Sequence, residues 1–321
     1  MKAVVLAGGY ATRLWPITKN RPKMFLPIGD TLVIDRIFEG LENDDRISEI
    51  FVSTNERFAD KFENHLKESP YEKPTLSVEE TTEEAEKLGV IGALHQLITR
   101  EGIAEDLIVV AGDNVISFDL SDFIDFFETK QGSALAAYDV GDRERAKSYG
   151  LVELADDEVI NFQEKPDEPK STLISIACYG FPAETLSLIG DYLASGENPD
   201  EPGWFIQWLQ DNHRVHGYTF EEAWFDIGTP ASYLDAVAWK LDGANLVAED
   251  AKVENTSLGE NVHIMDGATI RDSHIDNSVI FPNATIRNCD VRESIIDKQT
   301  HLKNIDFAGA VIGAHTQIAD G

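Results

Sequence analysis

The residues with the clearest chemical potential follow the first apolar run of the chain. Ala3–Leu6 is short and rich in β-branched residues, which predicts a buried strand of a parallel sheet. Gly8 and Gly9 then allow a sharp turn whose amide groups can approach an anion without interference from side chains. Arg13 and Lys23 add the positive charges that a phosphate chain requires. The pattern favours a phosphate-binding loop over an ordinary turn with surface cations.

A carboxylate follows the clearest buried strand of the sequence, residues 107–111. Asp113 comes directly after this run and Gly112, at the kind of strand end where open α/β sheets place their ligands. Mg²⁺ prefers a few hard oxygen ligands together with substrate phosphates. Asp113 is therefore a candidate metal ligand, and the alternative is a helix cap or an Asx turn.

A second carboxylate lies in the motif of residues 224–230. Thr229 followed by Pro230 is typical of a helix start, with threonine as the N-cap and proline as the first helical residue. The capping role belongs to Thr229, which leaves Asp226 available for other chemistry.

The stretch of residues 6–27 resembles the signature of the sugar-1-phosphate nucleotidyltransferases, L-A-G-G-x-G-T-R-L-x-P-x-T-x-x-x-P-K-x-L-x-P. One fixed glycine differs, because this chain has Ala11 at that position. If the position requires a positive φ, alanine costs about 1 kcal/mol there. The segments 88–94, 149–152, 162–166 and 224–230 resemble further motifs of the same family.

The resemblance implies a complete site and a reaction. The implied catalytic residues are Arg13, Lys23 and Lys165. The implied nucleotide-binding residues are Leu6, Ala7, Gly8, Gly9, Glu79 and Gly89. The implied sugar-binding residues are Gly150, Glu164 and Tyr179, and the implied ligands of Mg²⁺ are Asp113 and Asp226. The expected reaction joins an NTP and a sugar-1-phosphate to give an NDP-sugar and pyrophosphate.

The choice of substrates stays open. Relatives that prefer uracil or thymine often carry glutamine where Glu79 falls, and a glutamate lacks the amide donor. The family favours UTP or dTTP with glucose-1-phosphate. A mannose-1-phosphate guanylyltransferase is the alternative enzyme, and a non-catalytic regulatory or assembly subunit is the alternative of another class.

Strand and helix patterns alternate through residues 1–243, which predicts a Rossmann-like, mostly parallel sheet in a nucleotidyltransferase domain. From residue 244 the helical patterns disappear. Apolar residues then recur with a period of 16, as in the column Ile264, Ile280, Ile296 and Ile312. Three apolar columns of this kind predict a parallel β-helix over residues 244–321. It resembles the left-handed hexapeptide β-helix of the same family, which implies a homo-oligomer; an acyltransferase site on it is not expected.

The chain of 321 residues carries 58 acidic against 27 basic side chains, a net charge of −31. This charge disfavours binding to nucleic acid or to an anionic membrane. Because the acidic residues are dispersed, we expect a cytoplasmic protein adapted to molar salt. No apolar run is long enough to span a membrane, and Cys178 and Cys289 are expected to be buried thiols.

Overall fold

The computed structural model describes residues 1–79 and 88–320, so the acidic segment 80–87 lies outside the described part. The chain forms two compact units. The first contains residues 1–9 and 34–224, and the second contains residues 10–33 and 225–321. The division of the sequence after residue 243 stays a prediction.

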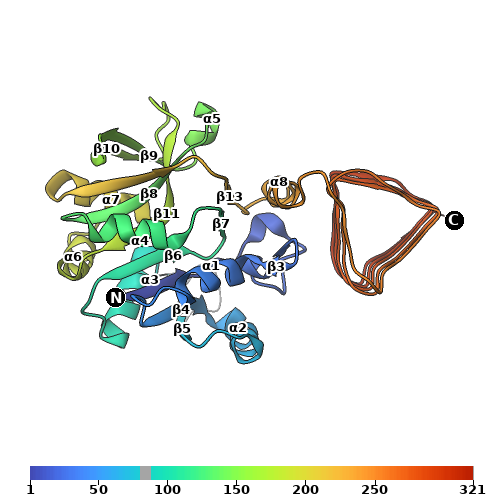
Figure 1. The fold of residues 1–321 in the computed structure, drawn as a ribbon, viewed down its shortest axis with the longest axis horizontal. Helices are drawn as coiled ribbons and strands as arrows, with labels where there is room; N and C mark the ends of the chain where they lie inside the picture. Colours follow the sequence, from blue (N-terminus) through green and yellow to red (C-terminus); the bar gives the residue numbers. More distant parts are fainter. Residues whose placement is uncertain (80–87, 321) are drawn as a thin grey trace. The chain divides into compact units, whose positions relative to one another are not determined.

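The first unit is built on a sheet that has nine strands in the described part of the chain (Figure 1), in the order β5-β4-β1-β6-β11-β8-β12-β10-β9. The strands are β1 (Lys2–Leu6), β4 (Glu49–Asn55), β5 (Pro74–Glu79), β6 (Leu107–Ala111), β8 (Ser133–Asp139), β9 (Gly150–Ala155), β10 (Glu158–Glu164), β11 (Leu173–Phe181) and β12 (Val215–Phe220). Strands β5, β4, β1 and β6 run parallel, β11 is antiparallel to β6 and β8, and β12 is parallel to β8. The predicted α/β fold is confirmed.

Helices connect these strands, as the alternating sequence pattern predicts. They are α1 (Val33–Glu42), α2 (Glu56–Glu68), α3 (Val90–Glu101), α4 (Leu120–Glu128), α5 (Arg143–Ala146), α6 (Ala183–Ala194) and α7 (Pro202–Asn212). Their starts are set by local chemistry: the Asn55 side chain accepts from Phe58 N–H, and the Asp119 side chain accepts from Ser121 N–H. Two further short strands are β7 (Asn114–Ile116) in the first unit and β13 (Trp224–Asp226), which begins at the last residue of the first unit and continues into the second.

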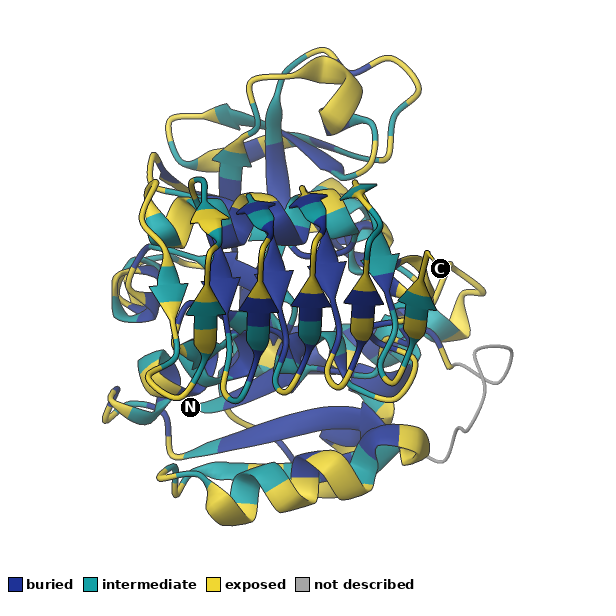
Figure 2. Cartoon of the chain, turned by 90° about the vertical axis from the view of Figure 1, so that its right-hand side faces the viewer, coloured by how far each residue is buried: buried dark blue, intermediate teal, exposed yellow. Residues whose placement is uncertain are grey.

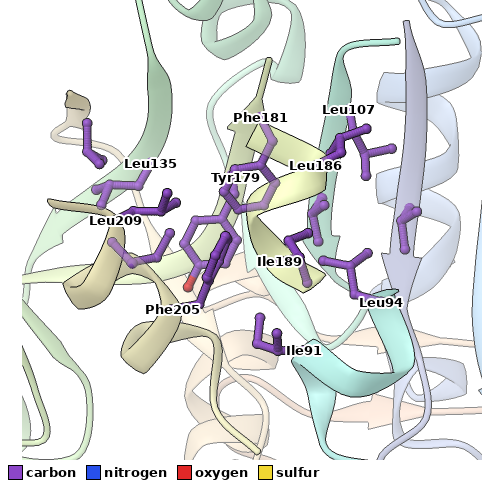
Figure 3. Close-up of a cluster of buried hydrophobic side chains, with 14 of the residues drawn as sticks. Ile91, Leu94, Leu107, Leu135, Tyr179, Phe181, Leu186, Ile189, Phe205 and Leu209 are labelled. Atoms are coloured by element: carbon purple, nitrogen blue, oxygen red, sulfur yellow. The ribbon is translucent and has the colours of Figure 1, made fainter. Parts of the chain in front are cut away.

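The core of the first unit lies between the sheet and helices α3, α6 and α7 (Figure 3). The rings of Tyr179 and Phe181 on β11 stack with centroids 5.7 Å apart, and Phe205 of α7 meets Phe181 edge-on. Leu94 of α3 and Ile189 of α6 close the same cluster. Cys178 and Cys289 are buried free thiols, as predicted. Within residues 1–79 and 88–320, no helix is long and apolar enough to cross a membrane.

The second unit combines a loop, one helix and a β-helix. Its first segment holds two short 3-10 helices, η1 (Thr12–Leu14) and η2 (Lys23–Phe25), and the hairpin of β2 (Pro27–Ile28) and β3 (Thr31–Leu32). Helix α8 (Pro230–Leu241) begins at Thr229, whose side chain and Ser232 form a capping box. The predicted N-cap is therefore confirmed.

The rest of the unit is a left-handed parallel β-helix with a triangular cross-section (Figure 1). Its first face carries β14 (Leu246–Val247), β17 (His263–Ile264), β20 (Val279–Ile280), β23 (Ile295–Ile296) and β26 (Val311–Ile312). Its second face carries β15 (Lys252–Glu254), β18 (Thr269–Arg271), β21 (Thr285–Arg287), β24 (His301–Lys303) and β27 (Gln317–Ala319). Its third face carries β16 (Ser257–Leu258), β19 (His274–Asp276), β22 (Asp290–Arg292) and β25 (Phe307–Ala308).

The predicted apolar columns fill the inside of this β-helix. Ile264, Ile280 and Ile296 pair in register on the first face and are fully buried, and Figure 2 shows the same alternation of buried and exposed residues along each coil. The spacing is 16 residues except at the first coil, where Val247 pairs with Ile264 at 17. Each coil buries its apolar residues against its neighbours, so the stack is stable only as a series.

Candidate functional site

Four parallel strands of the first unit end side by side. Leu6 at the end of β1 is in register with Ser53 of β4 and with Ala111 of β6. Asn55, the last residue of β4, is in register with Glu79, the last residue of β5. The loops that leave these strands therefore start at one edge of the sheet, the edge where open α/β sheets bind ligands.

Gly8 and Glu79 meet at this edge. A Cβ atom at Gly8 would lie 3.1 Å from Glu79 Oε1, and the Ser53 hydroxyl donates to the same oxygen at 3.1 Å. The Asn55 amide donates to the Gly8 carbonyl at 2.8 Å and holds the turn in place. Burial raises the pKa of Glu79, while the hydrogen bond from Ser53 lowers it. At Gly9 a Cβ would meet no described atom within 4 Å, so this backbone is open to a ligand.

Asp113 leaves the neighbouring strand at the same edge. Gly112, just before it, donates from its N–H to the Leu6 carbonyl at 2.9 Å, which ties the exit of β6 to the exit of β1. The next side chain, Asn114, is buried and bonds to the Ile176 carbonyl and to the Trp224 indole N–H. Of the two adjacent polar residues, Asn114 has a structural role, and the half-buried Asp113 remains the candidate ligand.

A second group of predicted residues surrounds the ends of β9 and β10. Gly150 and Glu164 are in register, and a Cβ at Gly150 would lie 2.9 Å from Glu164 Oε2. The same carboxylate lies against the backbone of Gly203 in the first turn of α7, where any side chain would overlap it. Burial and the charge of Glu201 together raise the pKa of Glu164 to about 7, against the opposing effect of Lys165.

Lys165 forms an ion pair with Glu201, a residue that the sequence analysis did not select. The Lys165 backbone has a φ of +44°, and its N–H donates to the Tyr149 carbonyl at 3.1 Å. Glu201 stands directly before Pro202 and Gly203, which open α7. In the sequence, Glu201 is marked only by its position before a proline at a helix start. Its pairing with Lys165 could not be predicted, because Lys165 lies 36 residues away.

Gly89 connects the two groups through the loop before α7. Its φ is +76°, and a Cβ there would overlap the carbonyl of Pro199. The N–H of Ile91 donates to that carbonyl at 2.9 Å, and the N–H of Val90 donates to Asp200 O at 3.3 Å. Because Glu201 follows at once, the loop links the start of α3 to the partner of Lys165. This packing accounts for the glycine, and a contact of Gly89 with a base stays a prediction.

Tyr179 lies in the core that Figure 3 shows, with its ring 3% exposed. Burial raises the pKa of its hydroxyl, and the charge of Glu164 acts in the same direction. The Ser175 hydroxyl donates to the Tyr179 hydroxyl at 3.5 Å, and the ring is a packing element of the core. Its predicted role at a sugar stays a prediction.

Three predicted residues belong to the second unit. Arg13 and Asp226 both lie next to Gly228, since a Cβ there would be 2.9 Å from Arg13 Nη2 and 3.2 Å from Asp226 Oδ1. Lys23 opens η2 and is half-buried. The second unit therefore brings Arg13 and Asp226 together, as the resemblance implies for one site.

The donor chemistry of the two aspartates fits Mg²⁺. Both Asp113 and Asp226 offer hard carboxylate oxygens and are half-buried. Among the described residues, no group of three or more His, Cys, Asp or Glu side chains is arranged to hold a metal. One or two carboxylates completed by substrate phosphates are the usual ligands of Mg²⁺.

Comparisons with known proteins place this fold and site in a family. The family model described as nucleotidyl transferase matches residues 2–242, and the model of a GlmU-like C-terminal hexapeptide domain matches residues 241–319. The chain therefore belongs to the nucleotidyl transferase family.

Individual relatives agree with this placement. The chain is 31% identical over 287 residues to a protein of Sulfolobus acidocaldarius provisionally named mannose-1-phosphate guanyltransferase, covering 86% of this chain and 76% of that one. It is 30% identical over 270 residues to the bifunctional protein GlmU of Methanocaldococcus jannaschii, of which it spans 61%. A crystal structure from Bacillus anthracis, provisionally named glucose-1-phosphate thymidylyltransferase, superposes with a TM-score of 0.66 at 26% identity, over 75% of this chain and 95% of that chain.

Proposed function

We propose that the chain transfers a nucleoside monophosphate from an NTP to a sugar-1-phosphate and releases pyrophosphate. The observation that carries the proposal is the shared edge of the parallel strands β5, β4, β1 and β6, where Glu79 ends β5, the open Gly8–Gly9 turn follows β1 and Asp113 follows β6. Backbone amides and a carboxylate at one sheet edge suit a nucleotide and its phosphates. The nucleotidyl transferase family supports the same reaction class.

The predicted catalytic residues and metal ligands each have a role in this proposal. The sugar phosphate is already a nucleophile, so one of its oxygens attacks the α-phosphorus and pyrophosphate leaves, without a covalent enzyme intermediate. Lys165 orients the sugar phosphate, while Arg13 and Lys23 stabilise the triphosphate and the leaving group. Mg²⁺, held by Asp113 and Asp226, would neutralise charge that develops on the phosphates.

The identity of the nucleotide base is the more specific part of the proposal. UTP or dTTP with glucose-1-phosphate is the first pair to test, in line with the family pattern. Glu79 favours guanine, and thus the nucleotide of a second candidate pair, GTP with mannose-1-phosphate. An ionised carboxylate only accepts hydrogen bonds, and guanine presents two neighbouring donors, whereas the donor of uracil or thymine is flanked by carbonyl oxygens. The location of Glu79 beside Gly8 makes this contact available.

A pyrophosphate-release assay in molar KCl tests the proposal. Five NTPs are combined with four sugar-1-phosphates, and at least one pair should give turnover. The variant Asp113→Ala should then lose about 100-fold or more in kcat, since a charge-stabilising group at a phosphoryl centre is removed.

The matched control is Asp122→Ala, an exposed aspartate on α4, which should keep its kcat within about twofold. Both variants should retain the wild-type circular dichroism spectrum. Wild-type protein that gives no pyrophosphate with any pair would support the non-catalytic alternative. Normal turnover of Asp113→Ala would show that the reaction does not require Asp113.

A further inference from the structure

The loop of residues 10–33, which carries Arg13 and Lys23, packs on the C-terminal part of the second unit. The hydroxyl of Tyr233 in α8 donates to the Pro27 carbonyl at 2.8 Å. Pro16 lies on the β-helix at Gly313, where a Cβ would be 2.9 Å from the proline Cβ. The loop is therefore held at two points, Pro16 and Pro27, by residues more than 200 positions away in the sequence.

The centre of the loop is held by an ion pair to the β-helix. Arg21 Nη2 donates to Asp297 Oδ1 at 2.9 Å, and the two side chains are only 19% and 5% exposed. The Arg21 guanidinium also lies 4.4 Å from the centroid of the Phe281 ring. The Lys298 N–H donates to the same Asp297 oxygen at 2.8 Å, which fixes the orientation of the carboxylate.

This contact has a defined geometry. A guanidinium that is stacked on a ring and paired with a buried carboxylate has few alternative arrangements, because moving it would leave a charge in a poorly solvated place. Arg21 Nη1 is itself buried without a hydrogen-bond partner among the described residues, so Asp297 is the main compensation for this charge. Burial raises the pKa of Tyr233, on which Arg21 and Asp297 act with opposite signs. Tyr233 contacts the loop directly through its hydrogen bond to the Pro27 carbonyl.

We propose that Asp297 and Phe281 of the β-helix are positioning residues for the phosphate-binding loop. They hold Arg21, and Arg21 holds the backbone from which Arg13 and Lys23 extend. The β-helix then contributes to NTP binding by holding this loop, in addition to any role in oligomerisation. The effect on NTP rests on the proposed function, whereas the anchoring of the loop does not.

The test compares Asp297→Asn with the wild-type full-length protein in molar KCl. Asparagine keeps the shape of the side chain and removes its charge. We expect the KM for the NTP to rise about tenfold or more, because small displacements of phosphate-binding groups are costly, while the KM for the sugar-1-phosphate stays within about twofold. Amide hydrogen exchange in peptides covering residues 10–33 should become faster.

The matched control is Asp290→Asn, which removes the partner of Arg292 in an exposed ion pair on the same β-helix. It should leave both KM values and the loop exchange unchanged. If Asp297→Asn does not fold, Phe281→Leu is measured in the same way, because leucine keeps an apolar contact and removes the ring face. A purely structural role would lower the melting temperature without separating the two KM values.

Two results would overturn the inference in different ways. An active wild type whose Asp297→Asn variant keeps its KM for the NTP refutes the role at the NTP site. Unchanged exchange of the loop in that variant refutes the anchoring. If the wild type releases no pyrophosphate with any substrate pair, the proposed function fails instead, and the exchange comparison alone decides on the anchor.

Discussion

At the scale of single residues, Glu164 has the most informative environment in the candidate site. Its carboxylate lies between Gly150 and the start of α7, and Glu201 adds a second negative charge nearby. Burial and the charge of Glu201 together raise its pKa from 4.5 to about 7, against the opposing charge of Lys165. Between these pH values the folded chain keeps a proton that the unfolded chain has lost, so the free energy of unfolding falls as the pH rises across this range.

The variant Glu164→Gln should remove this pH dependence. We expect its melting temperature, relative to wild type, to be clearly higher at pH 8 than at pH 5, because glutamine has no carboxylate to ionise. Differential scanning fluorimetry in molar KCl at both pH values measures the effect. Glu168→Gln, at an exposed position shortly after Lys165, is the control and should show the same difference from wild type at both pH values. If the melting temperature of Glu164→Gln differs from wild type by the same amount at pH 5 and pH 8, the raised pKa of Glu164 is refuted.

Single residues also show where sequence reasoning ends. Gly8 and Asp113 could be selected because each follows a short apolar strand directly, and the strand end is where α/β sheets bind ligands. Glu201 and Asp297 could not be selected, because their roles come from partners 36 and 276 residues away. A surface carboxylate and a buried ion-pair partner look alike in a sequence.

At the scale of elements, local signals predicted the secondary structure well. Thr229 and Pro230 begin α8 as expected, and the 16-residue period gave the coils of the β-helix. Strand β12 (Val215–Phe220) was not predicted, because histidine and glycine interrupt its apolar pattern. It is defined by its pairing with β8, a contact between segments about 80 residues apart. The other strands of this half of the sheet, in which parallel and antiparallel pairs are mixed, likewise depend on long-range pairing.

The loop before η1 carries a conformational cost that was expected from the sequence. Ala11 has φ 50° and ψ 45°, a left-handed conformation in which a Cβ is crowded. We expect Ala11→Gly to raise the free energy of unfolding by up to about 1 kcal/mol. Urea unfolding in molar KCl, followed by tryptophan fluorescence, measures the change.

Ala59→Gly is the control for Ala11→Gly. Ala59 lies within α2, where glycine should lower the free energy of unfolding by about 1 kcal/mol. The two variants make the same chemical change and should have effects of opposite sign. A loss of stability in Ala11→Gly would show that the backbone strain is relieved in another way.

At the scale of the whole molecule, the charge of −31 dominates. Few cations are present to compensate it, and one of them, Arg46, contacts the three carboxylates Asp44, Asp125 and Glu128. Repulsion among dispersed carboxylates favours unfolding at low ionic strength. At about 1 M salt the Debye length is near 3 Å, so this repulsion is screened.

We therefore expect the melting temperature to rise steadily from dilute buffer to molar KCl. The increase should level off near 1 M, where the screening length approaches the size of an ion contact. NaCl at equal ionic strength should give nearly the same curve if screening is the cause. A melting temperature that does not change between dilute and molar KCl would refute adaptation to salt.

The first coil of the β-helix shows how this architecture can change its length. Strand pairs there are 17 residues apart, and the spacing becomes 16 from His263 onward. The extra residue lies in the corner of residues 259–262, and the apolar columns continue in register on both sides of it. Corners thus absorb insertions that the flat faces would not tolerate. The β-helix thus accommodates a single additional residue at a corner while the strand pairing on its faces is kept.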